Sequence, residues 1–119
     1  MFQNRLYTRS PFEDIENGYK LTVSFIWDHD VFKGHFPSKP VVPGVLLMQM
    51  VKESFENFVQ KETHITGADL KFINPVTPES VKDLMLETTF SESDNTYKIK
   101  SIGYSGEVSF FKIKMDLKS

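Results

Sequence analysis

Residues 31–50, VFKGHFPSKPVVPGVLLMQM, decide the fold that this sequence predicts. Three prolines, the last of them Pro43, each fix φ at about −65°, so His35 is expected on a stiff loop. Pro43-Gly44 then leads directly into an apolar run, and proline suits the first turn of a helix because the N–H that it lacks would have no partner there. A titratable imidazole held beside the free N–H groups of a helix start is a candidate catalytic site.

From about residue 43 to residue 61 the apolar residues recur at the spacing of a helix. They fall on two stripes that together cover most of the circumference, one with Val45, Met48, Phe55 and Val59, the other with Leu47, Val51 and Phe58. This pattern is typical of a helix that other elements wrap, and not of one that rests on a surface.

The remainder of the chain reads as strands and turns. Alternating polar and apolar residues predict strands at 19–27, 65–76, 81–92, 96–105 and 107–117, and a weaker strand near 4–9. The sheet must curl around the helix, since a flat sheet would leave most of the apolar circumference in water. We therefore expect an α+β fold in which a curved antiparallel sheet surrounds one helix, in a single domain at residues 1–119.

Composition narrows the class of protein. The net charge of −2 and the scattered lysines argue against nucleic acid as a partner. The absence of cysteine excludes disulfides, thiol nucleophiles and thiolate metal sites. No stretch resembles a signal peptide or reaches the roughly 20 apolar residues of a membrane span, so a cytoplasmic protein is expected. Eleven phenylalanines predict a core of large aromatic side chains, or a cavity that they line.

Two segments resemble a known family. GHFPSKPVVPGVLLMQ (34–49) is similar to the GHFPGxPxxPGVLxxE pattern of the β-hydroxyacyl-acyl carrier protein dehydratases, and LKFINPVTP (70–78) is similar to their KFRRPVxPG segment. The resemblance covers most of the chain and implies a hotdog fold, with residues 43–61 as its central helix. It also implies that two subunits pair edge to edge, and that each active site at their interface takes His35 from one subunit and a helix residue from the other.

The resemblance assigns roles to five residues. His35 matches the catalytic histidine, and Gly44 matches the helix-start glycine whose N–H polarises the thioester carbonyl, as a preorganised donor does in an oxyanion hole. Val42 and Pro43 would shape the mouth of the substrate tunnel, and Phe36 would form a wall of the acyl cavity.

One position departs from the pattern in a way that affects the chemistry. Gln49 occupies the place of the family's catalytic Glu or Asp. An amide has no proton to give at neutral pH, although it can hydrogen-bond a hydroxyl, a water or His35. Glu53 lies four residues further along the same helix face and is a candidate replacement acid. The alternative is that Glu53 is a solvated side chain or an ion-pair partner at the interface.

The two other histidines carry weaker signals. His29, in Asp28-His29-Asp30, resembles a metal ligand set, but further ligands at useful spacing are missing, so a turn is the favoured interpretation and no metal or cofactor is expected. His64 follows the predicted helix and is expected to cap its C-terminus, where a cation is favoured.

Four lysines are expected near the tunnel entrance. Lys33, Lys39 and Lys52, with Lys71 nearby, would attract an acidic carrier protein that bears a phosphopantetheine arm. The alternative is that they are ordinary solvated surface lysines.

The leading functional hypothesis is a dehydratase that eliminates water from a 3-hydroxyacyl thioester and forms a trans-2-enoyl thioester, as in the synthesis of fatty acids or polyene lipids. The substrate would be a thioester of acyl carrier protein or of CoA, and the protein a homodimer or a larger assembly of dimers. Two alternatives remain open at this point: a non-catalytic acyl-binding subunit that partners an active dehydratase, and an acyl thioesterase.

Overall fold

The computed structural model describes residues 3, 5–28, 41–81 and 83–119. The one helix in these ranges, α1 (Gly44–Val59), follows three strands and precedes four others along the chain. The strands before it are β1 (Tyr7–Arg9), β2 (Glu13–Ile15) and β3 (Gly18–Phe25), and those after it are β4 (His64–Phe72), β5 (Leu84–Ser93), β6 (Thr96–Ser105) and β7 (Val108–Lys118).

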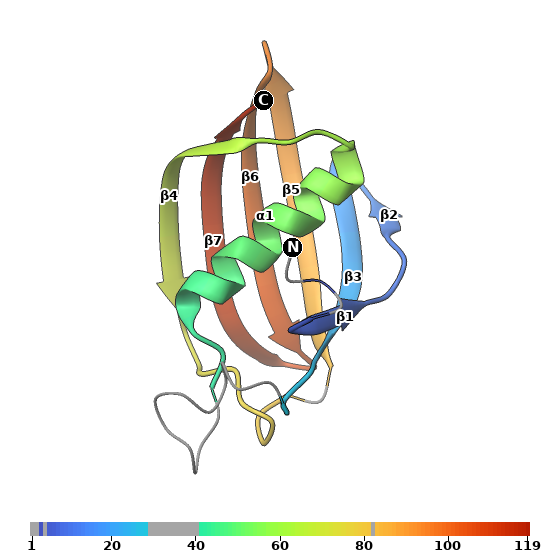
Figure 1. Cartoon of the computed structure of the whole chain (residues 1–119), viewed down its shortest axis with the longest axis vertical. Coiled ribbons are helices and arrows are strands. Elements are labelled where there is room, and N and C mark those ends of the chain that lie inside the picture. The colour runs from blue at the N-terminus through green and yellow to red at the C-terminus, as the bar shows by residue number, and fades with distance from the viewer. Residues whose placement is uncertain (1–2, 4, 29–40, 82) are drawn as a thin grey trace.

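All seven strands belong to one antiparallel sheet. The strand order is β1-β3-β5-β6-β7-β4, and β2 pairs separately with β3. The helix crosses one face of this curved sheet, with β4 along one edge (Figure 1). The predicted α+β architecture, a curved antiparallel sheet around one helix, is therefore confirmed.

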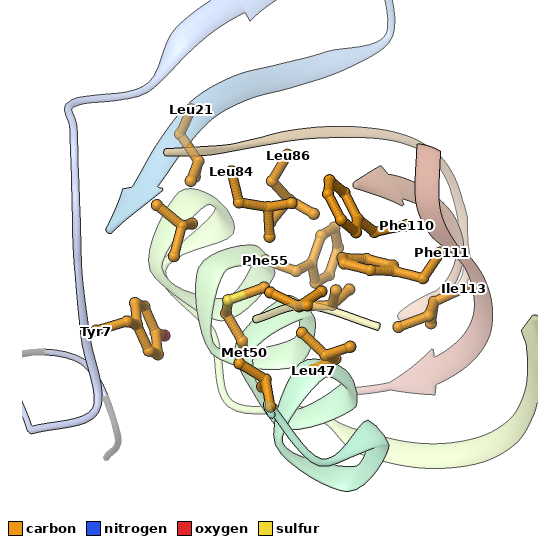
Figure 2. Packing of buried hydrophobic residues seen from close by; sticks show 14 of the residues in the cluster. Tyr7, Leu21, Leu47, Met50, Phe55, Leu84, Leu86, Phe110, Phe111 and Ile113 are labelled. Carbon is orange, nitrogen blue, oxygen red and sulfur yellow. The ribbon is translucent and has the colours of Figure 1, made fainter. Parts of the chain in front are cut away.

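The core lies between α1 and the sheet face that it covers. Phe55 of α1 is fully buried, and its ring makes edge contacts with Phe90 and Tyr97 at centroid distances of 5.0 and 5.1 Å. Phe110 and Phe111 lie in the same cluster (Figure 2). The aromatic core that the composition predicts is therefore present. Edge-to-face pairs of this kind contribute about 0.5–1.5 kcal/mol beyond their buried area.

The helix ends without the predicted histidine cap. Gln60 takes the left-handed conformation at φ 58°, and its N–H donates to the carbonyl of Glu56 over 2.8 Å. His64 is the first residue of β4 and is exposed, and the last helical turn has no basic residue. The prediction for His64 is wrong, because a left-handed C-cap already satisfies the helix end and the chain then turns directly into the sheet.

The end of β4 and the presence of β2 also differ from the sequence prediction. The strand expected at 65–76 ends at Phe72, because the N–H groups of Ile73 and Asn74 both donate to the Phe110 carbonyl, over 2.8 and 3.2 Å. The short strand β2 was not predicted, since three residues are too few to show a period of two.

Candidate active site

The two segments that carry the family resemblance meet at the start of α1. The backbone N–H of Val42 donates to the Val76 carbonyl over 2.9 Å, which ties the chain before the helix to the chain after β4. The ring of Phe72 lies against Gly44, where a Cβ atom would be only 2.6 Å from the ring's Cζ. Figure 1 shows the start of α1 and the end of β4 at the same end of the molecule. Glycine is therefore required at position 44 for this close contact.

A cavity of about 300 Å³ opens beside this contact. Its walls come from the helix start and from the segment after β4: Val42, Gly44, Leu47, Phe72, Ile73, Asn74, Pro75 and Val76. Most of these side chains are apolar, and the Asn74 amide already donates to the Ser109 carbonyl over 2.8 Å. The cavity therefore suits an apolar chain, with polar groups supplied mainly by the backbone.

The helix start supplies hydrogen-bond donors to this cavity. Pro43 is the N-cap with φ −60° and ψ 145°. No side chain of the described residues caps the first turn, which also has no acidic residue. The first N–H groups of a helix have no partner within it, and they form the positive end of the helix dipole. Gly44 lines the cavity, and the role that the resemblance assigns to its N–H stays a prediction.

Gln49 and Glu53 lie on another side of the helix. Val45, Gln49 and Glu53 are spaced four residues apart and form one row along the helix. This row lies opposite the buried face, which carries Leu47 and Phe55. Neither Gln49 nor Glu53 lines the cavity at Gly44. Glu53 is nine residues from Gly44, or about 13 Å along the helix axis.

Glu53 packs beside Tyr7, which reaches it from the N-terminal segment. The Tyr7 hydroxyl and one carboxylate oxygen of Glu53 are both buried. Burial, and then the nearby Glu53 carboxylate, raise the pKa of the Tyr7 phenol above its ordinary value. Figure 2 shows the Tyr7 ring beside α1 with its hydroxyl toward the helix. Glu53 is therefore shielded by the N-terminal segment on this side instead of facing open solvent.

The other predicted site residues divide into two groups. His35 and Phe36 lie outside the described residues, as do His29, Lys33 and Lys39. Lys52 forms an ion pair with Glu56 over 3.2 Å, and Lys71 is exposed on β4. The structure thus brings Val42 and Gly44 to the cavity, while the ammonium group of Lys52 is already paired.

Sequence reasoning missed Phe72 and Ile73 as parts of the site. The signal was present, because both lie in the second matched segment, where Phe72 matches the pattern's phenylalanine and Ile73 replaces an arginine. Tyr7 left no such signal, since its contact with Glu53 joins positions 46 residues apart in the chain.

No group of three or more His, Cys, Asp or Glu side chains that could hold a metal ion occurs among the described residues. In the same part of the chain, no helix is long and apolar enough to span a membrane.

Comparison with known proteins shows which family the chain resembles. The model of the ApeI-like family, described as ApeI dehydratase, matches residues 13–109. A 3-hydroxyacyl-acyl-carrier-protein dehydratase, FabZ, from Levilactobacillus brevis is 30% identical over 115 residues, which are 90% of this chain and 74% of that protein. FabZ from Lactococcus lactis is 35% identical over 82 residues, 62% of this chain and 54% of the relative. The chain therefore spans about half the length of several of its relatives.

Solved structures share the fold. A chain of the dehydratase heterocomplex ApeI:P from Xenorhabdus doucetiae superposes with a TM-score of 0.71 at 18% identity, over 94% of this chain and 95% of that one. The curved sheet and its helix are therefore a hotdog fold.

Proposed function

The chain belongs to the ApeI-like dehydratase family, and from this membership we propose that it eliminates water from a 3-hydroxyacyl thioester carried on an acyl carrier protein. The observation that carries the proposal is the cavity at Gly44, where an uncapped helix start meets the apolar residues that follow β4. The N–H groups suit a thioester carbonyl, and the apolar walls suit an acyl chain.

The proposed reaction uses one acid–base group. His35 takes a proton from C2 while the Gly44 N–H stabilises the charge that develops on the thioester oxygen. The C3–O bond then breaks, and the imidazolium returns the proton to the leaving hydroxyl. The products are water and a trans-2-enoyl thioester, so that atoms and charge balance without a second acid.

Gln49 and Glu53 take different parts in this proposal. Gln49 positions the substrate hydroxyl or the departing water by hydrogen bonding, because an amide can donate and accept such bonds without losing a proton. Glu53 is the alternative acid. Its place beside Tyr7, about 13 Å along the helix from Gly44, favours His35 as the group that protonates the hydroxyl.

We also propose that the active unit is a dimer joined along the edge of β4. The row of unpaired backbone groups on an edge strand is normally covered. Four exposed apolar side chains on or near this edge support the proposal: Val45, Leu70, Phe72 and Ile73.

Turnover of synthetic 3-hydroxyacyl thioesters, followed by enoyl absorbance, tests the proposed function. Activity that His35→Ala lowers at least about 100-fold supports it, since general acid–base catalysis contributes about 10²–10⁴-fold. Gln49→Glu is expected to keep or raise the rate. An undiminished His35→Ala variant, or release of free thiol instead of enoyl product, would overturn the proposal, and the second result would indicate a thioesterase.

A second candidate function rests on Gln49. A solved relative of the same fold is part of a heterocomplex of dehydratases, and a subunit without the carboxylate could bind the acyl chain for an active partner. Purified chain that is inactive alone, but raises the rate of an added active homologue, would favour this function. Full activity of the chain alone would exclude it.

A further inference from the structure

The sheet face away from α1 carries a repeated lysine pattern. Strands β6 and β7 each contain the triplet Lys-Ile-Lys, at 98–100 and 112–114. Ile99 and Ile113 are buried, whereas the four lysines are exposed. Successive side chains of a strand point to opposite faces, so all four lysines project from the outward face of the sheet.

Strand register places these lysines opposite one another. Lys100 pairs with Lys114 between β6 and β7, and Lys112 pairs with Lys71 between β7 and β4. Like charges directly opposite each other destabilise a sheet. Within the described part of the chain, none of these lysines has an ion pair within 4.0 Å. Ion pairs therefore do not explain why these lysines are concentrated on one face.

The charge of this face is opposite in sign to that of the whole chain. Register places Asp69 opposite Lys114 and Asp116 opposite Lys98, on the same outward side. Five lysines and two aspartates leave this basic face with an excess of positive charge, while the whole chain carries −2. Two copies of the face would repel each other, so a second copy of the chain is a poor partner for it.

The basic face is also hollowed. A trough of about 790 Å³ crosses β4, β7, β6 and β5, and its charged lining residues are three lysines and two aspartates: Lys98, Lys100, Lys114, Asp69 and Asp116. A helix about 10 Å across, sunk to half its depth, would fill this volume over about 20 Å, or roughly 13 residues. The trough therefore fits an acidic helix better than a flat lipid surface.

We propose that this basic face, formed by Lys71, Lys98, Lys100, Lys112 and Lys114, is the surface on which an acidic helix of the carrier protein docks. The inference rests on the proposed function, because it assumes that the substrate arrives on a carrier. A single phosphate is too small, since strands lie about 4.8 Å apart and the lysines occupy three of them. Nucleic acid is disfavoured because both arginines, at positions 5 and 9, lie outside this face.

The basic face extends to the edge of the candidate active site. Lys71 and Phe72 are consecutive residues of β4, so their side chains point to opposite faces of the sheet. Lys71 belongs to the basic face, and Phe72 lines the cavity at Gly44. A carrier docked on the basic face would thus lie beside the strand whose other face forms the cavity wall.

The test compares two substrates that carry the same 3-hydroxyacyl group, one on carrier protein and one on N-acetylcysteamine. For Lys100→Gln/Lys114→Gln we expect the ratio of kcat/KM for the carrier substrate to kcat/KM for the small thioester to fall at least about tenfold. The matched control, Lys20→Gln/Lys61→Gln, removes the same charge outside the basic face and should keep the wild-type ratio. Calorimetry with apo carrier protein measures docking without catalysis, and the affinity should fall as salt rises from about 0.05 to about 0.5 M.

Each outcome decides between the two proposals. An unchanged ratio together with unchanged binding of apo carrier overturns the docking surface and leaves the dehydratase proposal intact. No turnover of either substrate overturns the proposed function, and lysine-dependent binding of apo carrier would then still support the surface. Equal or tighter binding of duplex DNA by the same lysines would overturn the assignment to a carrier protein.

Discussion

At the scale of single residues, Gly44 decides the geometry of the candidate active site. Its missing side chain admits the Phe72 ring, and its N–H lies at a helix start that no side chain of the described residues caps. Only the contact with Phe72 depends on the absent Cβ atom, so a substitution at this position changes the shape of the site and leaves the helix-start N–H in place.

Gly44→Ala is expected to lower kcat/KM for a 3-hydroxyacyl thioester by about 100-fold, because the Phe72 ring must move out of the site wall. The free energy of unfolding should change by less than about 1 kcal/mol, since alanine favours the helix and the ring is half exposed. Steady-state kinetics and urea denaturation measure the two quantities. The double variant Gly44→Ala/Phe72→Ala should regain part of the activity, and strictly additive losses would contradict a direct contact.

Ionisation of Tyr19 makes the free energy of unfolding depend on pH at alkaline pH. Burial raises the pKa of its phenol to about 12, while an unfolded tyrosine titrates at about 10. The folded state therefore holds the phenol proton more tightly than the unfolded state does. The resulting stabilisation of the folded state is complete below about pH 10 and is lost as the pH rises toward 12.

Urea denaturation between pH 8 and pH 12 tests this expectation. The unfolding free energy of the wild type should fall by up to about 1.4 kcal/mol per pH unit more steeply than that of Tyr19→Phe. The variant also loses the 3.0 Å hydrogen bond with Ser54, which lowers its stability at every pH. Parallel curves for the two proteins would show that Tyr19 does not contribute to alkaline unfolding.

The site residues that sequence could predict are those close together in the chain. Val42 and Gly44 lie in one contiguous segment that resembles the family pattern, so the resemblance could assign them to the site, and their roles remain predictions. Phe72 and Tyr7 were not predicted, because their contacts depend on how β4 and the N-terminal segment lie against α1. The roles of His35, Phe36, Gln49 and Glu53 remain predictions.

At the scale of elements, the connection from α1 to β4 depends on one carboxylate. Glu56 accepts hydrogen bonds at Oε2 from the Thr63 N–H over 2.6 Å, from the Thr63 hydroxyl over 3.2 Å and from Lys52 over 3.2 Å. These bonds hold the chain between the helix and the edge strand, and charged acceptors make the stronger class of hydrogen bond.

Glu56→Ala is therefore expected to lower the free energy of unfolding by about 2 kcal/mol. Glu56→Gln should lose less, because the amide oxygen still accepts a bond from Thr63. Glu62→Ala is the matched control, since Glu62 is exposed in the same connection and should change stability by less than about 0.5 kcal/mol. Equal losses at positions 56 and 62 would contradict the assigned role.

Elements were predictable where a period extends over many residues. The strand expected at 96–105 coincides with β6, and the helix expected at 43–61 with α1 (Gly44–Val59). The end of β4 was not predictable, because it depends on two N–H groups that donate to the carbonyl of Phe110, which lies in a strand distant in sequence. Local pattern thus determines where an element lies, while long-range hydrogen bonds determine where it stops.

At the scale of the whole molecule, the edge formed by β4 and the start of α1 remains apolar. The side chains of Val45 and Phe72 are 59% and 51% exposed, although Phe72 contacts Gly44 and Val45 follows Gly44 in the chain. Exposed apolar groups on an edge strand favour association with another chain. This is the structural basis of the proposed dimer, and it places the cavity at Gly44 beside the proposed interface.

Val45→Glu is expected to convert the protein from dimer to monomer in sedimentation equilibrium, because it places a charge in the apolar interface. The helix itself should be retained, since an acidic residue in the first turn interacts favourably with the helix dipole. Val108→Glu is the matched control at an exposed valine of β7, and it should stay dimeric. If the active sites form between subunits, Val45→Glu should lose turnover together with dimer mass, and a fully active monomer would contradict both the interface and the shared site.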